Sequence, residues 1–251
     1  MNKKKLLLKQ PALFVCLMLM ILVLFSQCKT AATQNRNSAP IRVLMVGGGS
    51  SHDFDRWYKA EDAQTIAREG LATVTYTDNT DSIAHYLKNT DLLLLTNNQP
   101  IKEAANRQAI FDFVNSGKGL VLAHAALWYN WKDWPEYNKQ LVSGGSRGHD
   151  RYGSFNVTVT NENHPVMKGV EKNFTLKDEL YYFKVDSSAA GITELARASA
   201  PGSDKSFPSV FVINHPKARI VGIALGHDAE SHTISPYQTI LRNSIRWAAK
   251  K

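Results

Sequence analysis

Cysteine is scarce in this sequence, and the positions of the two cysteines limit the available chemistry. Cys16 and Cys28 both precede residue 41, where the first predicted strand begins. The region expected to fold therefore has no thiol for an internal disulfide, a thiolate metal site or a cysteine nucleophile. Any reaction that this region catalyses has to use other side chains.

Concentrated positive charge is also lacking beyond the N-terminus. The whole chain carries a net charge of +8, but residues 1–27 hold four lysines and no acid, so the remainder carries +4. No basic run or nucleic-acid-binding motif follows, and we expect no nucleic-acid partner. The composition, with 43% hydrophobic and 10% aromatic residues, is that of a globular chain with one sizeable core.

The N-terminus has the pattern of an export signal. Lysines at positions 3–9 precede an uncharged apolar run at 12–25, which is typical of a signal peptide and short for a membrane span. Cys28 follows, as in a bacterial lipoprotein site, although Gln27 is large where that pattern has a small residue. The alternative is an unlipidated signal peptide with an incidental cysteine.

These features predict three segments. We expect a signal peptide of the lipoprotein type over residues 1–27, a flexible tether over 28–40, and a single α/β domain over 41–251. Acyl chains on Cys28 anchor a protein to a membrane without spanning it. The predicted location is therefore the periplasm or the cell surface, with the protein held by its lipid anchor.

The hydrophobic pattern alternates between strands and helices through residue 126. This predicts a mostly parallel open sheet with helices on both faces. The predicted strands cover residues 41–46, 72–77, 91–98, 119–126, 155–160, 179–183, 192–197, 209–214 and 218–226. The predicted helices cover residues 57–69, 101–116 and a last segment that begins at Ser235.

Histidines follow several of these strands. His52 comes after the first strand, His124 ends the fourth, His227 follows the late strand, and His149 lies between them. Each alone is also explained as a core or turn residue. Because ligands bind beyond the carboxyl ends of strands in open α/β sheets, we expect the histidines to share one rim. Histidine suits proton transfer near neutral pH and metal ligation.

Other residues have competing interpretations. Gly47–Gly49 lack the spacing of a phosphate-binding loop, so we expect a tight turn there. We expect His85 and His232 to face solvent. The Asp178–Glu179 pair is interpreted either as a general base or metal ligand, or as a solvated loop edge.

Aromatic residues crowd the segment from Trp128 to Tyr137. Aromatic faces pack against sugar rings, so a carbohydrate site is one interpretation. A hydrophobic lid that anchors its own loop is the other.

Five motifs in order closely resemble the ThuA-like, or trehalose utilisation, family. They are GKGLVLAHAALW (117–128), LVSGGSRGHD (141–150), His-Pro (164–165), KDELYYF (177–183) and RIVGIALGHD (219–228). The resemblance implies a flavodoxin-like fold related to class I glutamine amidotransferases, with His124 in place of their nucleophilic cysteine. Glutaminase chemistry by that route is then excluded. The resemblance also implies a role in the utilisation of trehalose, other glucosides or 3-keto-glycosides.

Two functional hypotheses follow, and neither fixes whether the protein forms a homodimer. The first is a hydrolase, lyase or isomerase that acts on such sugars by acid-base or metal-assisted chemistry. The second is a non-catalytic sugar-binding lipoprotein. The candidate catalytic residues are His124, His227 and Glu179, and the candidate sugar-binding residues are Trp128, Arg147, His149 and Tyr181. A divalent metal such as zinc has the candidate ligands His52, His149 and His227, which lack a close HxxxH spacing.

Overall fold

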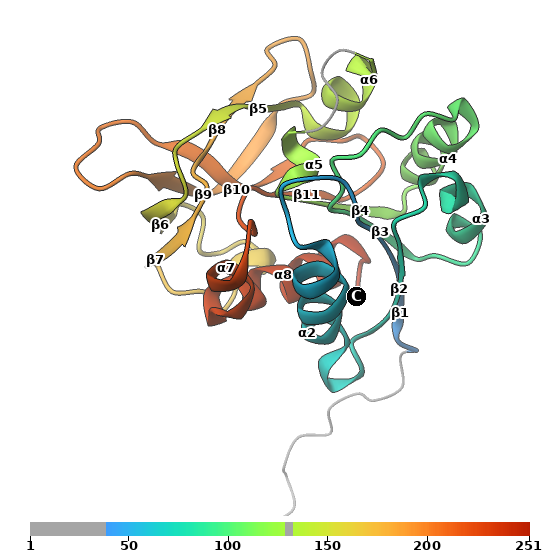
Figure 1. Cartoon of the computed structure of the whole chain (residues 1–251), viewed down its shortest axis with the longest axis horizontal. Helices are drawn as coiled ribbons and strands as arrows, with labels where there is room; N and C mark the ends of the chain where they lie inside the picture. Colours follow the sequence, from blue (N-terminus) through green and yellow to red (C-terminus); the bar gives the residue numbers. More distant parts are fainter. Residues whose placement is uncertain (1–38, 129–132) are drawn as a thin grey trace, which may run out of the picture. The chain divides into compact units, whose positions relative to one another are not determined.

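The computed structural model describes residues 39–128 and 133–251 (Figure 1). The predicted signal peptide, Cys28, the tether up to residue 38, and Tyr129 and Trp131 lie outside the described residues. Pro40–Lys251 forms one compact unit. Within the described ranges, no helix combines the length and the apolar character needed to cross a membrane.

A nine-stranded sheet forms the centre of this unit, with the strand order β2-β1-β3-β4-β11-β10-β9-β6-β7. A second sheet pairs β5 with β8. The strands are β1 (Ile41–Val46), β2 (Ala72–Thr77), β3 (Leu92–Leu95), β4 (Gly119–Ala123), β5 (Gly144–His149), β6 (Gly153–Val159), β7 (Asn173–Asp178), β8 (Tyr181–Val185), β9 (Ile192–Ser199), β10 (Phe207–Ile213) and β11 (Ile220–Ile223).

The large sheet has a parallel half and an antiparallel half. Strands β2, β1, β3, β4 and β11 pair in parallel, while β10, β9, β6 and β7 continue the sheet in antiparallel pairs. Parallel strands need long crossover connections, and helices provide them between β1 and β4. The prediction of an open α/β sheet is confirmed, and the antiparallel half extends it.

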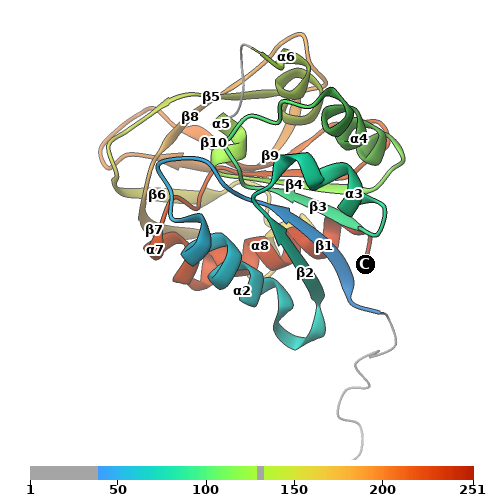
Figure 2. The same ribbon diagram turned by 45° about the vertical axis from the view of Figure 1, so that its right-hand side comes forward.

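Helices cover both faces of the sheet (Figure 2). The apolar residues of η1, α2 and α8 join one core cluster, those of α3, α4, α6 and η4 join the other, and α5 contributes to both. The helical segments are η1 (Phe54–Asp62), α2 (Ala63–Ala67), η2 (Arg68–Gly70), η3 (Thr80–Ser82), α3 (Ile83–Leu87), α4 (Ala104–Asn115), α5 (Ala125–Trp128), α6 (Pro135–Tyr137), η4 (Asn138–Val142), η5 (Pro165–Met167), α7 (Ala229–Thr233) and α8 (Ser235–Ala248).

No regular secondary structure is assigned to Gly47–Gly49, so the tight turn there stays a prediction. The Asn98 side chain accepts from the backbone of Ser50 at 2.9 Å and donates to it at 3.0 Å. The Gln99 amide donates to the Gly47 carbonyl at 2.9 Å. A Cβ at Gly49 would lie 1.7 Å from the Asn98 side chain, so the two pack closely. These contacts hold the start of the loop that carries His52.

Candidate functional site

Three of the predicted histidines meet at the carboxyl ends of the parallel strands. His52 follows β1, His124 follows β4 and His227 follows β11. Their ring centroids lie 4.7 Å apart for His52 and His227, 5.1 Å for His52 and His124, and 5.5 Å for His124 and His227. The end of an open α/β sheet thus collects residues that are far apart in the sequence.

Glu179 occupies the centre of this group. One carboxylate oxygen lies 3.3 Å from Nε2 of His227 and 3.5 Å from Nδ1 of His149, and the other lies 3.6 Å from Nε2 of His124. The Glu179 side chain is 17% exposed, whereas His124 is fully buried. The Glu179 carboxylate is therefore partly accessible from outside, whereas His124 is enclosed by the protein.

Backbone carbonyls fix the tautomers of three of these histidines. A carbonyl only accepts hydrogen bonds, so the facing Nδ1 carries the proton and Nε2 keeps its lone pair. The Nδ1 contacts are His52 to Ser50 at 2.9 Å, His124 to Ala224 at 2.9 Å and His149 to Asp150 at 2.8 Å.

Three buried ring nitrogens in this group have no hydrogen-bond partner within the described part of the chain. They are Nε2 of His52, Nε2 of His124 and Nδ1 of His227. Unpaired buried polar atoms are rare, and they commonly mark a site where a ligand, an ion or water completes the bonding. The cluster formed by His52, His124, His149, Glu179 and His227 is called the histidine cluster below.

The charges of the histidine cluster are unevenly distributed. Burial lowers the pKa of His52 to about 3, and burial together with His124 lowers the pKa of His227. Burial alone raises the pKa of the Glu179 carboxyl, but the facing imidazoles outweigh this, and the pKa lies below its ordinary value. At neutral pH an ionised carboxylate therefore faces neutral His52 and His227.

His124 has an unusual backbone conformation. Its φ of 37° lies in the left-handed region, which costs energy for a residue with a Cβ. The His124 amide donates to the Ile223 carbonyl at 2.7 Å, and Leu127 donates to the His124 carbonyl at 2.8 Å. This sharp turn ends the predicted strand at Ala123 and points the imidazole at Glu179.

Asp178 and Glu179 are adjacent but have different surroundings. The carboxylate of Asp178 is fully buried and accepts from the amides of Gly226 at 2.7 Å, His227 at 3.1 Å and Glu179 at 2.6 Å. It also accepts from the hydroxyl of Ser231. Asp178 therefore fixes the loop that carries His227, while Glu179 faces the imidazoles.

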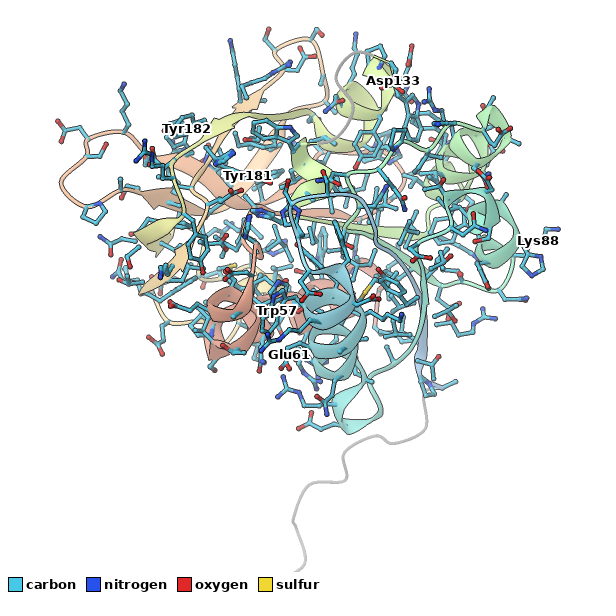
Figure 3. All side chains as sticks on the ribbon, viewed as in Figure 1. Trp57, Glu61, Lys88, Asp133, Tyr181 and Tyr182 are labelled. Carbon is cyan, nitrogen blue, oxygen red and sulfur yellow. The ribbon has the colours of Figure 1, made fainter. Side chains whose placement is uncertain are left out.

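An aromatic surface adjoins the histidine cluster. Trp128 is 39% exposed, and its ring lies 5.4 Å from the His149 ring and 5.9 Å from the Tyr181 ring. Tyr181, labelled in Figure 3, also packs 4.2 Å from His124. Trp134 and Tyr137 are buried in the core, so the lid interpretation holds for this pair.

Two further predictions concern Arg147 and a metal ion. Arg147 is exposed on β5. The pKa of the Asp186 carboxyl is lowered first by Ser188 and then by nearby cations that include Arg147. In residues 39–128 and 133–251, no three or more His, Cys, Asp or Glu side chains are arranged to hold one metal ion. The metal site stays a prediction, and the chemistry below uses the side chains alone.

Of the predictions that His85 and His232 face solvent, one is confirmed and one is wrong. His85 is exposed, as expected, but His232 is fully buried, so the prediction that it faces solvent is wrong. His232 pairs with the buried Asp62 on η1, which sequence reasoning did not single out. Tyr152, also missed, donates to the Asp228 carboxylate beside His227.

Comparison with known proteins agrees with this architecture. The sequence profile of the ThuA family, described as trehalose utilisation, matches residues 42–248. No curated protein matches the chain.

Similar solved structures include a ThuA-like protein from Parabacteroides merdae ATCC 43184, with 22% identity and a TM-score of 0.73 over 84% of this chain and 90% of that chain. Another from Bacteroides uniformis ATCC 8492 has 20% identity and a TM-score of 0.72 over 87% of this chain and 95% of that chain. The acivicin-bound glutaminase domain of Trypanosoma brucei CTPS matches with 13% identity and a TM-score of 0.49 over 84% of this chain and 94% of that chain.

The profile match confirms the resemblance carried by the five sequence motifs. It extends from β1 to the end of α8 and so covers nearly all of the compact unit. The two ThuA-like structures share the α/β fold. This chain belongs to the ThuA, or trehalose utilisation, family.

Proposed function

We propose that the histidine cluster is the active site of an enzyme that moves a proton on a neutral sugar, with Glu179 as the general base. The observation that carries this proposal is the position of Glu179, a partly exposed carboxylate among three imidazoles. General bases need access to the substrate and partners that accept or return the proton. Glu179 meets both requirements.

The substrate class follows from the chemistry of a carboxylate base. A keto group makes the neighbouring C–H acidic, so a 3-keto-glycoside offers a proton that Glu179 can remove. The C–H electrons form an enolate, the proton stays on the carboxyl, and the enolate then either expels the glycosidic oxygen or is reprotonated. If the enolate expels the glycosidic oxygen, the protein is a lyase. If the enolate is reprotonated, the protein is an isomerase.

The neighbouring histidines support this role. The lone pair on Nε2 of His124 faces Glu179 at 3.6 Å, and Nε2 of His227 lies 3.3 Å from the other carboxylate oxygen. His227 is 18% exposed, so it can contact a ligand, and the proton that Glu179 has taken up can return to a leaving oxygen. His124 is buried beside Glu179, and its Nε2 lone pair can accept a hydrogen bond from the carboxyl once Glu179 is protonated.

The aromatic surface supports a sugar as the ligand. Trp128 presents an exposed ring beside Tyr181 and His149, and ring faces pack well on the apolar faces of sugars. The ionised Glu179 beside neutral His52 and His227 disfavours a second anion. We therefore expect an uncharged sugar to be preferred over a sugar phosphate.

Turnover of a keto-glycoside is the direct test. The chain from Lys29 onward is incubated with trehalose, other glucosides and their 3-keto forms, with a chelator or with added divalent metal, and products are followed by NMR. We expect a new product from a 3-keto form. Ligand-induced shifts without any product would instead support the non-catalytic sugar-binding protein, and no response to any sugar would contradict both.

We also propose that the protein is exported and anchored by lipid on Cys28, on the evidence of the N-terminal sequence pattern. In a bacterial host, the full chain is expected in the membrane fraction. Cys28→Ala is expected to move it to the soluble fraction, because the acyl attachment site is lost, and Cys16→Ala is the matched control. Membrane retention of the Cys28→Ala protein would contradict lipidation.

A further inference from the structure

A second histidine site lies beneath the histidine cluster, between η1, α7 and α8. His232 is fully buried, and its ring stacks on Trp57 at 5.8 Å and 11°. Trp57 is labelled beside α7 in Figure 3. The mechanism proposed above does not use His232, so its buried polar ring needs another explanation.

Both ring nitrogens of His232 face hydrogen-bond acceptors. Nδ1 lies 2.8 Å from a carboxylate oxygen of Asp62, and Nε2 lies 3.1 Å from the carbonyl of Gly226. A carbonyl cannot donate, so Nε2 must carry a proton. The second oxygen of Asp62 accepts from the Tyr237 hydroxyl at 2.9 Å, which stabilises the ionised carboxylate and leaves the second proton on Nδ1.

The charged groups around His232 agree with an imidazolium. Burial alone lowers its pKa, but the charge and hydrogen bond of Asp62, followed by the charge of Asp178 and the Gly226 carbonyl, raise the pKa above its ordinary value. The facing titratable groups are Asp62 and Tyr58 on η1, Tyr237 on α8 and Asp178 on β7. Burial raises the pKa of both tyrosines well above the ordinary value, so they stay neutral.

The Gly226 peptide connects this pair to the histidine cluster. The Gly226 carbonyl accepts from His232 and from the Tyr58 hydroxyl. The amides of Gly226 and His227 donate to Asp178. The residue before His227 is thus held from both sides of its backbone, and its φ of +114° suits glycine.

We propose that His232 is a positioning residue: paired with Asp62 as a buried imidazolium and carboxylate, it holds the Gly226 carbonyl and thereby directs His227 toward Glu179. The effect on catalysis rests on the proposed function. The charge state of His232 and the placement of His227 do not, and they are measured separately.

The charge state is tested by ¹⁵N NMR of the full chain with labelled histidine. At pH 6.5, the ordinary pKa of histidine, we expect the form with both nitrogens of His232 protonated to predominate. His215 is the internal control, because the amides of Lys217 and Ala218 donate to its Nδ1 and require that nitrogen to be unprotonated. A neutral His232 at this pH would overturn the proposal.

Two variants distinguish the effect of the His232 charge from the effect of its hydrogen bond to Gly226. Asp62→Asn can keep every hydrogen bond, since its amide donates to a neutral Nδ1 and its oxygen accepts from Tyr237. We expect His232 to become neutral while the ¹⁵N shifts of His227 remain close to wild type, because the hydrogen bond to Gly226 is kept. Asp62→Asn/His232→Phe removes the bond to Gly226 without leaving a buried charge. Here we expect altered His227 shifts and a kcat lower by about 10- to 100-fold, with KM nearly unchanged.

The pH dependence of stability gives a further readout. A histidine whose pKa is raised by folding stabilises the protein fully below the unfolded value, and this contribution is lost as pH rises through the folded pKa. We expect wild type to lose this stability above pH 6.5, the ordinary value for histidine, and Asp62→Asn to lack that loss. Unchanged His227 shifts in a folded double variant would overturn the positioning role, whether or not any sugar is turned over.

Discussion

Glu179→Gln is expected to lower kcat by about 10²- to 10⁴-fold, the usual contribution of a general base. Glutamine has nearly the same shape but cannot take up a proton. It leaves the three facing imidazoles in place, so we expect the fold and sugar binding to be retained. The measurement is initial rate on the 3-keto-glycoside that gives product, together with ligand-induced NMR shifts.

Glu162→Gln is the matched control for this change. Glu162 forms an exposed ion pair with Lys172 at 2.9 Å, and such pairs contribute little. We expect its kcat to equal that of wild type. Full activity in Glu179→Gln would remove Glu179 as the base and leave His149 and His227 as the accessible side chains of the histidine cluster.

Asp178→Asn, unlike Glu179→Gln, is expected to destabilise the fold strongly. We expect the free energy of unfolding to fall by about 3–5 kcal/mol, because a buried anion that satisfies several donors is removed. An asparagine turns its amide group toward at least one of the amides of Gly226, His227 and Glu179, where two donors repel each other. Urea unfolding followed by circular dichroism measures the loss.

The control for Asp178→Asn is Asp112→Asn on α4. Asp112 is exposed and accepts from Gln108 at 2.8 Å, so we expect a change within about 0.5 kcal/mol. A similarly small change in Asp178→Asn would mean that the loop before α7 holds its shape without this carboxylate. Together, Asp178 and Glu179 would show that adjacent acids divide structural and chemical roles.

The sequence was sufficient to predict the parallel half of the sheet and the meeting of its histidines. The run GLVLA is buried throughout and IRVLMV is buried except at Arg42, and such apolar runs indicate interior strands. Since parallel strands end at the same edge, the residues after them converge without any knowledge of contacts. This is why His52, His124 and His227 could be grouped in advance.

The rest depended on contacts that no local pattern records. His232 and Asp62 are 170 residues apart, and α7 is too short to show an amphipathic repeat. A histidine in such a segment looks like a solvent-exposed residue until its partner is known. The edge strand β7 was also missed, although its side chains alternate between exposed and buried along Asn173–Asp178.

The position of β11 makes the site one of the last parts of the protein that can form. Residues 220–223 pair with β4 on one side and β10 on the other, although they lie near the end of the chain. Before the ribosome has delivered them, β4 and β10 each present an open edge, which is the kind of surface that pairs with other chains. His227 follows the β11 strand, so a chain truncated before β11 loses both the strand that joins β4 to β10 and one of the three histidines near Glu179. Formation of the histidine cluster therefore waits for a strand near the end of the chain.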